Sequence, residues 1–349
     1  MLIAALRDLQ WRRRRFVIAI VGTAMVFAMT LVLTGLANGF DAEARRTVDT
    51  IGVTDFLIKD GSVGPFLGSG RFPQREVGVV AGVPGVRAAT PLVYAAAILQ
   101  GDRGPENVNV FGAPSDGPGM PVPRDGAIPT LPDEAAVSTT LGREIGESLE
   151  INSRTLRIVG LLEDSTALAG QANVFMTLGG AQLLLFSGQP LISSVAVDGE
   201  PQHTPQGYRL IGHEDAVADL LRPLHGAYTA MSYMAALLWA VAALIVGSLI
   251  YLSVLERTRD FAVFKAIGVP TRSVLAGLAM QAVIVASVSA LLGAVLSQVI
   301  GPVFPMRVLV PVSAFVLLPV LAVGIGLLAT GAGLRRTVRI DPALAFGGQ

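Results

Sequence analysis

The apolar run FVIAIVGTAMVFAMTLVLTGLA, residues 16–37, decides the class of fold that this sequence can form. A helix needs about 20 mostly apolar residues to cross the roughly 30 Å hydrocarbon core of a bilayer. This run contains no charged residue and follows the basic cluster Trp11-Arg-Arg-Arg-Arg15. It predicts a first transmembrane helix over residues 16–38. A cleaved secretory signal fits less well, because the run is too long for a signal core and no A-x-A site follows it.

Three later stretches have the same character and predict further transmembrane helices at residues 228–254, 274–300 and 310–334. The composition agrees with this interpretation. Of the 349 residues, 52% are hydrophobic and 15% are charged, whereas an average soluble domain has about 25% charged residues. The expected fold is therefore an α-helical membrane protein with four transmembrane helices.

Basic residues gather in the segments that an even number of crossings places on one side of the membrane. Residues 1–15, 255–273 and 335–349 together hold 12 basic and 4 acidic residues, and the remainder is net acidic. The excess of arginine beside the spans predicts that this side is cytoplasmic. Both termini are then inside, in a multi-pass protein of the inner (cytoplasmic) membrane. The side chains expected at the membrane interface are Trp11, Arg12, Arg13, Arg14, Arg15, Arg335 and Arg336.

The N-terminal segment, residues 1–15, has apolar residues at helical spacing before its arginines. It predicts a small amphipathic helix at the lipid surface, with a simple basic tail as the alternative. Residues 335–349 form a cytoplasmic tail.

Residues 39–227 lie between the first and second spans and predict an extracytoplasmic α+β domain. Short runs of β-branched and apolar residues predict strands, and apolar residues at helical spacing predict helices. The helices are expected at residues 74–81, 138–146, 179–186 and 214–221. A strand pair is expected across Asn152-Ser153. The loops 61–70 and 114–132 are rich in Gly and Pro, so we expect them to be irregular and to face solvent.

The two ends of this domain continue the helical pattern of the neighbouring spans. Phe40, Ala44, Val48 and Ile51 recur at helical spacing among charged residues after the first span. Val217, Leu220, Leu221 and Leu224 do so before the second span. We expect both spans to extend outward as amphipathic stalk helices that pack on each other.

The cytoplasmic segment 255–273 contains Glu256-Arg-Thr-Arg-Asp-Phe-Ala-Val-Phe-Lys-Ala-Ile-Gly268. Helical spacing places Phe261, Phe264, Lys265 and Gly268 on one face. Gly268 and Pro270 are typical of a helix end. An aromatic face of this kind requires a groove, which lipid, the same chain or a cytoplasmic partner can supply.

This segment resembles the E-R-x-R-E-x-x-x-L-K-A-x-G motif in permease subunits of MacB/FtsX/LolC-type (DevC-like) ABC transporters. Asp260 replaces the usual Glu, and Phe264 replaces the usual Leu. Residues 335–345 resemble the C-terminal ending of the same family, and the four-span layout with a large insertion after the first span is also similar. Short family motifs resemble Val83-Pro-Gly-Val86, Val110-Phe-Gly112 and Ile158-Val-Gly160.

The resemblance implies a MacB-like periplasmic core domain with a small inserted subdomain, and a permease homodimer bound to two ATPase subunits. ATP and Mg would be bound by the ATPase, and hydrolysis would move the stalk and outer domain, an action called mechanotransmission. Export, lipid or lipoprotein handling and cell-envelope regulation are the implied roles, with an extracytoplasmic adaptor or hydrolase as a further partner. The implied ATPase-coupling residues are Glu256, Arg257, Arg259, Asp260, Phe261, Phe264, Lys265 and Gly268.

Several functions are disfavoured by what the sequence lacks. It has no Walker A motif and no G-x-S-x-G motif, so neither ATP hydrolysis nor a serine hydrolase is expected. It has no cysteine, and its histidines fit no zinc motif, so no metal, cofactor or catalytic residue is expected. Nothing indicates a nucleic-acid partner. The alternatives are a membrane-anchored signalling or scaffolding protein that binds an extracellular partner, and a small-solute importer permease.

Overall fold

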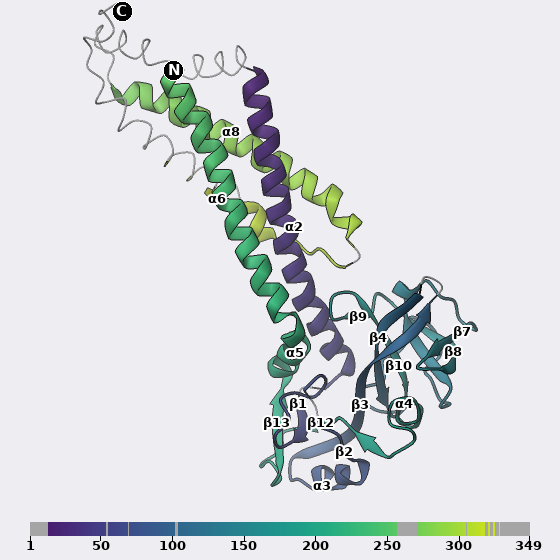
Figure 1. The fold of residues 1–349 in the computed structure, drawn as a ribbon. Coiled ribbons are helices and arrows are strands. Elements are labelled where there is room, and N and C mark those ends of the chain that lie inside the picture. Colours follow the sequence, from purple (N-terminus) through teal and green to yellow (C-terminus); the bar gives the residue numbers. More distant parts are fainter. Residues whose placement is uncertain are drawn as a thin grey trace, which may run out of the picture. The chain divides into compact units, whose positions relative to one another are not determined.

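The computed structural model describes residues 13–53, 55–68, 70–101, 104–256, 271–304 and 306–317, together with residues 320, 321, 324 and 328. The chain divides into two compact units (Figure 1). The membrane unit combines residues 1–38 with residues 227–349, and the outer domain comprises residues 39–226.

Long apolar helices dominate the membrane unit. They are α2 (Arg13–Ile51), α6 (His225–Glu256) and α8 (Thr271–Ile300), and the short 3₁₀ helix η4 (Gly301–Val303) follows α8. Within the described residues, three segments are long and apolar enough to cross a membrane, namely Phe16–Ile51, His213–Ser248 and Ala279–Val303. The first three expected spans therefore correspond to helices. Of the fourth, residues 310–334, the structure describes about half, including a helical start at residues 312–317, and the full span stays a prediction.

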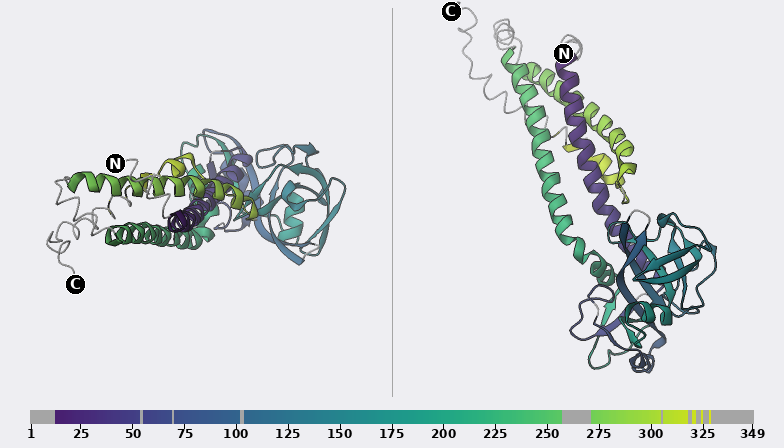
Figure 2. Two further views of the ribbon diagram at one scale, coloured as in Figure 1. Left: turned by 90° about the horizontal axis from the view of Figure 1, so that it is seen from above. Right: turned by 45° about the vertical axis from the view of Figure 1, so that its right-hand side comes forward.

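Among the described residues of the membrane unit, helices α2, α6 and α8 (Figure 2) share a small apolar cluster. Phe27 and Leu31 of α2 meet Ala242 of α6 and Ala286 and Ala290 of α8. Small residues allow membrane helices to approach closely. Gly293 of α8 illustrates this, because an added Cβ there would lie 2.8 Å from the Cβ of Phe27.

The outer domain is built on strands that the described residues connect into one eleven-stranded sheet, with the order β13-β1-β12-β3-β4-β10-β6-β8-β5. Strand β7 pairs with β3 and β8, and β9 pairs with β10. The bounds are β1 Asp55–Lys59, β3 Val86–Gly101, β4 Gly104–Ala113, β5 Asp125–Gly126, β6 Glu134–Ser138, β7 Ser148–Ile151, β8 Arg154–Leu162, β9 Thr166–Ala167, β10 Gln171–Thr177, β12 Ser194–Gly199 and β13 Tyr208–Gly212. A separate small pair joins β2 (Phe72–Pro73) to β11 (Leu191–Ile192).

Strand β3 belongs to both halves of the large sheet. Its first half, Val86 to Leu92, pairs with β12, and its second half, Val93 to Gly101, pairs with β4. The half that contains β13, β1 and β12 is antiparallel. The other half is mixed, because β10 runs parallel to β4 and β6 runs parallel to β8.

Helices cover both faces of the sheet, so its central strands are buried on both sides. One face packs against α3 (Val77–Ala81) and α4 (Leu178–Leu185). The other packs against the end of α2 and against α5 (His213–Leu221). Strand β1 shows the alternation that this requires, since Leu57 belongs to the first core and its neighbours Phe56 and Ile58 belong to the second.

Short 3₁₀ helices complete the outer domain: η1 (Gln74–Glu76) leads into α3, η2 (Thr139–Leu141) follows β6, and η3 (Arg222–Leu224) joins α5 to α6. The expected helices at 74–81, 179–186 and 214–221 are confirmed by η1 with α3, by α4 and by α5. The strand pair across Asn152-Ser153 is confirmed as β7 and β8, with positive φ angles of 46° and 63° at the two turn residues. These angles are those of a tight hairpin turn.

The helix expected at residues 138–146 is wrong. Ser138 ends β6, and its side chain accepts a hydrogen bond from the Thr140 amide at the start of η2. Gly142 and Gly146 then adopt φ angles of 63° and 94°. A left-handed residue interrupts α-helical hydrogen bonding, so the turn cannot extend into a helix.

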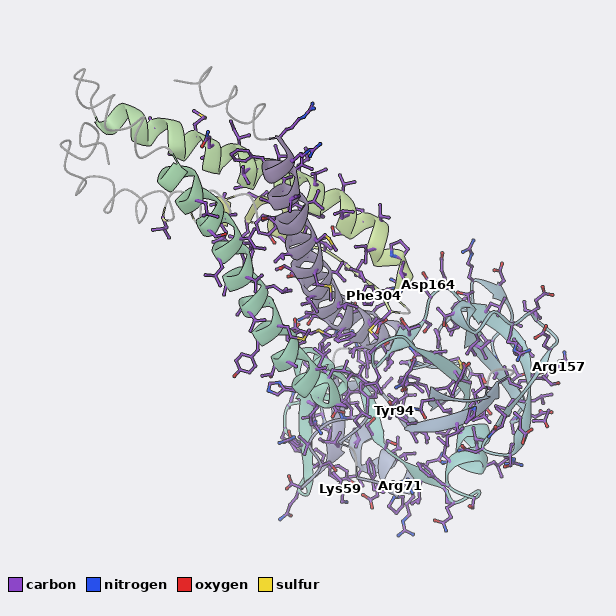
Figure 3. All side chains as sticks on the ribbon, turned by 45° about the horizontal axis from the view of Figure 1, so that its top comes forward. Lys59, Arg71, Tyr94, Arg157, Asp164 and Phe304 are labelled. Carbon is purple, nitrogen blue, oxygen red and sulfur yellow. The ribbon has the colours of Figure 1, made fainter. Side chains whose placement is uncertain are left out.

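The expectation that loops 61–70 and 114–132 simply face solvent is wrong in part. Phe66 is only 2% exposed and lies in an aromatic cluster with Phe56, Tyr94 and Phe111. Tyr94, labelled in Figure 3, is itself buried in the outer domain. The Gly119 amide donates to the Ile51 carbonyl at 2.8 Å, which satisfies a carbonyl at the end of α2. Both loops are therefore partly structural.

Candidate functional site

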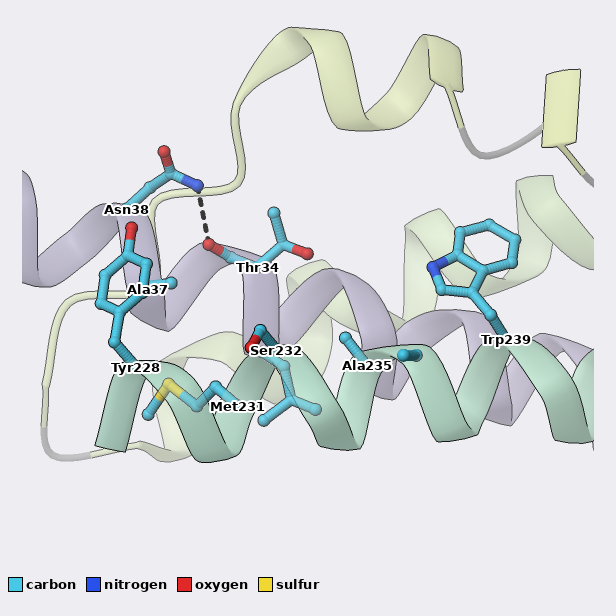
Figure 4. A pocket seen from close by; sticks show the side chains of 10 residues that line it. Thr34, Ala37, Asn38, Tyr228, Met231, Ser232, Ala235 and Trp239 are labelled. Atoms are coloured by element: carbon cyan, nitrogen blue, oxygen red, sulfur yellow. Dashed lines mark hydrogen bonds between the residues drawn. The ribbon is translucent and has the colours of Figure 1, made fainter. Parts of the chain in front are cut away.

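A pocket of about 460 Å³ lies between helices α2 and α6 of the membrane unit (Figure 4). This volume is in the range of small-molecule binding pockets. Helix α2 contributes four residues and α6 contributes six: Leu33, Thr34, Ala37 and Asn38, then Tyr228, Met231, Ser232, Ala235, Ala236 and Trp239. All ten are uncharged, so the pocket offers an ionised group no side chain of opposite charge.

The two ends of the pocket differ in chemistry. Asn38 and Tyr228 lie at one end and Trp239 lies at the other (Figure 4). The Asn38 amide group donates to the Thr34 carbonyl at 2.7 Å, and the Ser232 hydroxyl donates to the Thr229 carbonyl at 2.7 Å. Their donors are thus bonded to their own helices, which lowers the cost of placing them among apolar groups. The arrangement suits an apolar or amphipathic molecule with an uncharged polar end.

Trp239 joins the pocket to the packed centre of the membrane unit. Its ring contacts that of Phe27, with centroids 5.6 Å apart and planes tilted by 51°. Phe27 is almost fully buried among the three helices. A change in the spacing of α2 and α6 would therefore alter the surroundings of Trp239.

Helix α2 continues unbroken from the pocket into the outer domain. It ends at Ile51, and Gly52 follows with a φ angle of 75°, which is typical of a helix C-terminus. Ala44, Val48 and Ile51 of α2 share one core with Ala216, Val217 and Leu220 of α5. The stalk formed by two outward-extended spans stays a prediction.

Ion pairs cross the exposed side of this contact between α2 and α5. Arg45 donates to Glu214 at 2.6 Å and 3.0 Å, and to Asp41 on its own helix at 2.8 Å. His213 lies 2.7 Å from Asp49. The hydrogen bonds to Glu214 and Asp41 raise the pKa of Arg45, and Arg45 lowers the pKa of Glu214. Solvent screens exposed pairs of this kind, so each contributes little to stability.

Most of the residues that sequence reasoning singled out lie outside the described part of the chain. This holds for Arg257, Arg259, Asp260, Phe261, Phe264, Lys265 and Gly268, and for Trp11, Arg12, Arg335 and Arg336. Glu256 is the last residue of α6, and Arg13, Arg14 and Arg15 lie in the first turn of α2. Their coupling and interface roles stay predictions.

Sequence reasoning missed the pocket and two buried acidic residues, Glu43 and Asp219. Glu43 is 4% exposed and Asp219 is 1% exposed. A buried apolar residue lies three positions before each of them, Phe40 before Glu43 and Ala216 before Asp219, and this is the one signal that could have indicated burial. Among the described residues, no group of three or more His, Asp or Glu side chains could hold a metal ion.

Comparison with known proteins identifies the family. The model of the MacB-like periplasmic core domain matches residues 16–206, and that of the FtsX-like permease C-terminal domain matches residues 232–342. An uncharacterized ABC transporter permease of Mycobacterium bovis is 60% identical over 348 residues, with all of both chains covered. This chain belongs to the MacB/FtsX-type ABC transporter permeases. A second permease of this name, from Mycobacterium tuberculosis, is 55% identical, again over the whole of both chains.

The permease is also similar to the crystal structure of the periplasmic region of MacB from Actinobacillus actinomycetemcomitans. That likeness covers 47% of this chain and 91% of the other, with 12% identity and a TM-score of 0.35. Permeases of this class are membrane subunits and are not themselves catalytic, and membership implies a partner ATPase subunit.

Proposed function

We propose that this permease couples ATP hydrolysis by a separate subunit to motion of its outer domain, and that it thereby handles an apolar or amphipathic molecule taken from the membrane. The observation that carries this proposal is the uncharged pocket between α2 and α6. A charged cargo would lose hydration there without gaining an oppositely charged side chain. An amphiphile would place its apolar part against Trp239 and its polar end near Asn38 and Tyr228.

The continuity of α2 supports the mechanical part of the proposal. The same helix lines the pocket through Leu33 to Asn38 and enters the core of the outer domain through Ala44 to Ile51. A rigid helix transmits displacement along its length. Motion that changes the pocket is therefore also delivered to the outer domain.

The proposed assembly contains two permeases and two ATPases, with ATP and Mg bound by the ATPases. The permease lies in the inner membrane with both termini cytoplasmic. The segment from Glu256 to Gly268 docks on the ATPase through Phe261 and Phe264. An adaptor or hydrolase outside the membrane receives the motion or the cargo.

Replacing Phe261 and Phe264 together with Glu tests the docking. We expect the variant to insert in the membrane normally and to lose copurification with the ATPase, because two charges then occupy the face that enters the groove. The matched control replaces Val122 and Ile145 with Glu. These residues are 80% and 47% exposed on the outer domain. We expect this variant to copurify with the ATPase as the parent does. If the double Phe variant binds the ATPase as well as the parent, the docking assignment is wrong and a signalling role regains support.

A further inference from the structure

Helix α2 holds the outer domain through a buried carboxylate. Glu43 accepts a hydrogen bond from the Thr166 hydroxyl at 3.0 Å and another from the Gly170 amide at 3.1 Å. Both donors belong to the β9–β10 hairpin, whose turn residues Leu168, Ala169 and Gly170 have φ angles of 52°, 67° and 89°. Left-handed leucine and alanine persist only where their surroundings hold them.

A chain of hydrogen bonds continues from this contact into the sheet. Thr47, one turn after Glu43, donates to the Thr166 carbonyl at 3.1 Å and accepts from Asn173 at 3.3 Å. Asn109 donates to Asn173 at 3.2 Å and accepts from the Tyr94 hydroxyl at 2.9 Å. Helix α2 is thus bonded to strands β10, β4 and β3 through side chains that are all buried.

Helix α5 holds a different part of the outer domain in the same way. Asp219 accepts from the amides of Phe66 at 2.8 Å and Gly68 at 3.1 Å. Arg222 also donates to it, at 2.5 Å. The loop passes so close that a Cβ on Gly64 would lie 2.1 Å from the Asp219 side chain. Phe66 then enters the aromatic cluster with Phe56 and Tyr94.

We propose that Glu43 and Asp219 are the positioning residues that make the outer domain follow the two stalk helices, a role that rests on the proposed function. Apolar contacts are non-directional, so they do less than hydrogen bonds to fix the register of a helix. Charge-assisted hydrogen bonds to fixed backbone amides are directional and resist both movements. A buried carboxylate that accepts from two fixed donors, as Glu43 does from Thr166 and Gly170 and Asp219 does from Phe66 and Gly68, has no other equally good arrangement.

The two sites predict different responses to an acid-to-amide change. In Glu43→Gln, the new amide group can face Thr166, whose hydroxyl can turn and accept, while the remaining oxygen keeps the Gly170 amide. In Asp219→Asn, the new amide group must face a backbone N–H, which can only donate. Glu43→Gln should therefore keep the hydrogen bonds between α2 and the β9–β10 hairpin. Asp219→Asn should break those between α5 and the loop at Phe66 and Gly68. Adding Thr166→Val to Glu43→Gln removes the hydroxyl that would accept from the new amide group. The double variant should therefore lose the hydrogen bond between α2 and the β9–β10 hairpin.

The test measures movement of the outer domain in the complete permease, reconstituted with its ATPase in lipid nanodiscs. The chain has no native cysteine, so nitroxide labels can be attached to cysteines introduced in pairs. The pair Met25→Cys and Ser148→Cys measures the distance from α2 to the outer domain. The pair Leu237→Cys and Asp60→Cys measures the distance from α6 to the outer domain. Electron–electron distances are recorded without nucleotide and with ATP and vanadate. ATPase activity and thermal unfolding are measured on each sample.

We expect the parent and Glu43→Gln to show an ATP-dependent shift in distance. Glu43→Gln with Thr166→Val should lose the shift for the first pair of labels, and Asp219→Asn should lose it for the second, while ATPase activity persists. The exposed neighbours supply the controls, because Asp41→Asn and Asp215→Asn should keep the shift. If Glu43→Gln with Thr166→Val and Asp219→Asn both show the same distance shift as the parent, the positioning role is overturned and the proposed function stands. If the parent hydrolyses ATP without any shift, the proposed function itself fails.

Discussion

The two helical paths between the membrane unit and the outer domain are built differently. Helix α2 runs without interruption from Arg13 to Ile51. The other path is divided into α5, the 3₁₀ helix η3 and α6, with Pro223 inside η3. Proline has no amide hydrogen to donate, and a short 3₁₀ stretch between α-helices often marks a hinge. One path is thus a single α-helix, and the other contains a proline-bearing 3₁₀ segment between two α-helices.

The loop that α5 holds should produce the largest stability effect. Phe66→Ala removes a buried ring from contact with Phe56, Tyr94 and Phe111. A cavity of this kind typically costs about 3–5 kcal/mol of unfolding free energy. Denaturant unfolding of the full-length protein, followed by a probe in the outer domain, measures the loss. The control is Val122→Ala at an 80% exposed position. Equal unfolding free energies for the two variants would show that the loop is not an anchor.

Pro223→Ala tests the difference between the two paths directly. Alanine restores an amide donor and permits α5 and α6 to form one helix. We expect amide exchange over residues 222–226 to slow by about tenfold, the equivalent of one hydrogen bond's net free energy. Hydrogen exchange read by mass spectrometry measures this change. Pro201→Ala, in the loop before β13, should leave residues 222–226 unchanged. Unaltered exchange in Pro223→Ala would mean that proline does not cause the break.

The ion pairs on the outside of the α2–α5 contact should have the smallest effect. Arg45→Gln removes the bonds to Glu214 and Asp41. We expect a slight fall in melting temperature at low salt that disappears at about 0.5 M NaCl, where the Debye length is only a few ångströms. Arg87→Gln, which breaks an exposed pair with Asp198, should behave alike. A salt-independent loss in Arg45→Gln would place this pair among the contacts that hold the helices.

Sequence reasoning succeeded where a single local pattern decides the structure. The uncharged run at residues 16–37 predicts a membrane helix, and the spacing of Ala44, Val48 and Ile51 predicts its extension into the outer domain. It failed at residues 138–146, because the helical pattern there ignores two glycines in left-handed conformations.

Tertiary arrangement decides the rest of the site. Glu43 stands between the charged residues Asp41 and Arg45 in the sequence, yet it is buried because the β9–β10 hairpin lies over it. Nothing local predicts that hairpin. The pocket likewise depends on which faces of α2 and α6 meet, and two apolar helical sequences do not determine this alone.

ATP hydrolysis in the cytoplasm should reach the pocket between α2 and α6, and Trp239 can report this directly. The chain has two tryptophans, so Trp11→Phe leaves Trp239 as the single indole fluorophore. Its quenching by brominated phospholipid is measured in nanodiscs that contain the permease and its ATPase, before and after ATP with vanadate is added. We predict that nucleotide changes the quenching, and that an ATPase variant unable to bind ATP shows no change. Unchanged quenching of Trp239 while the complex hydrolyses ATP would contradict the account.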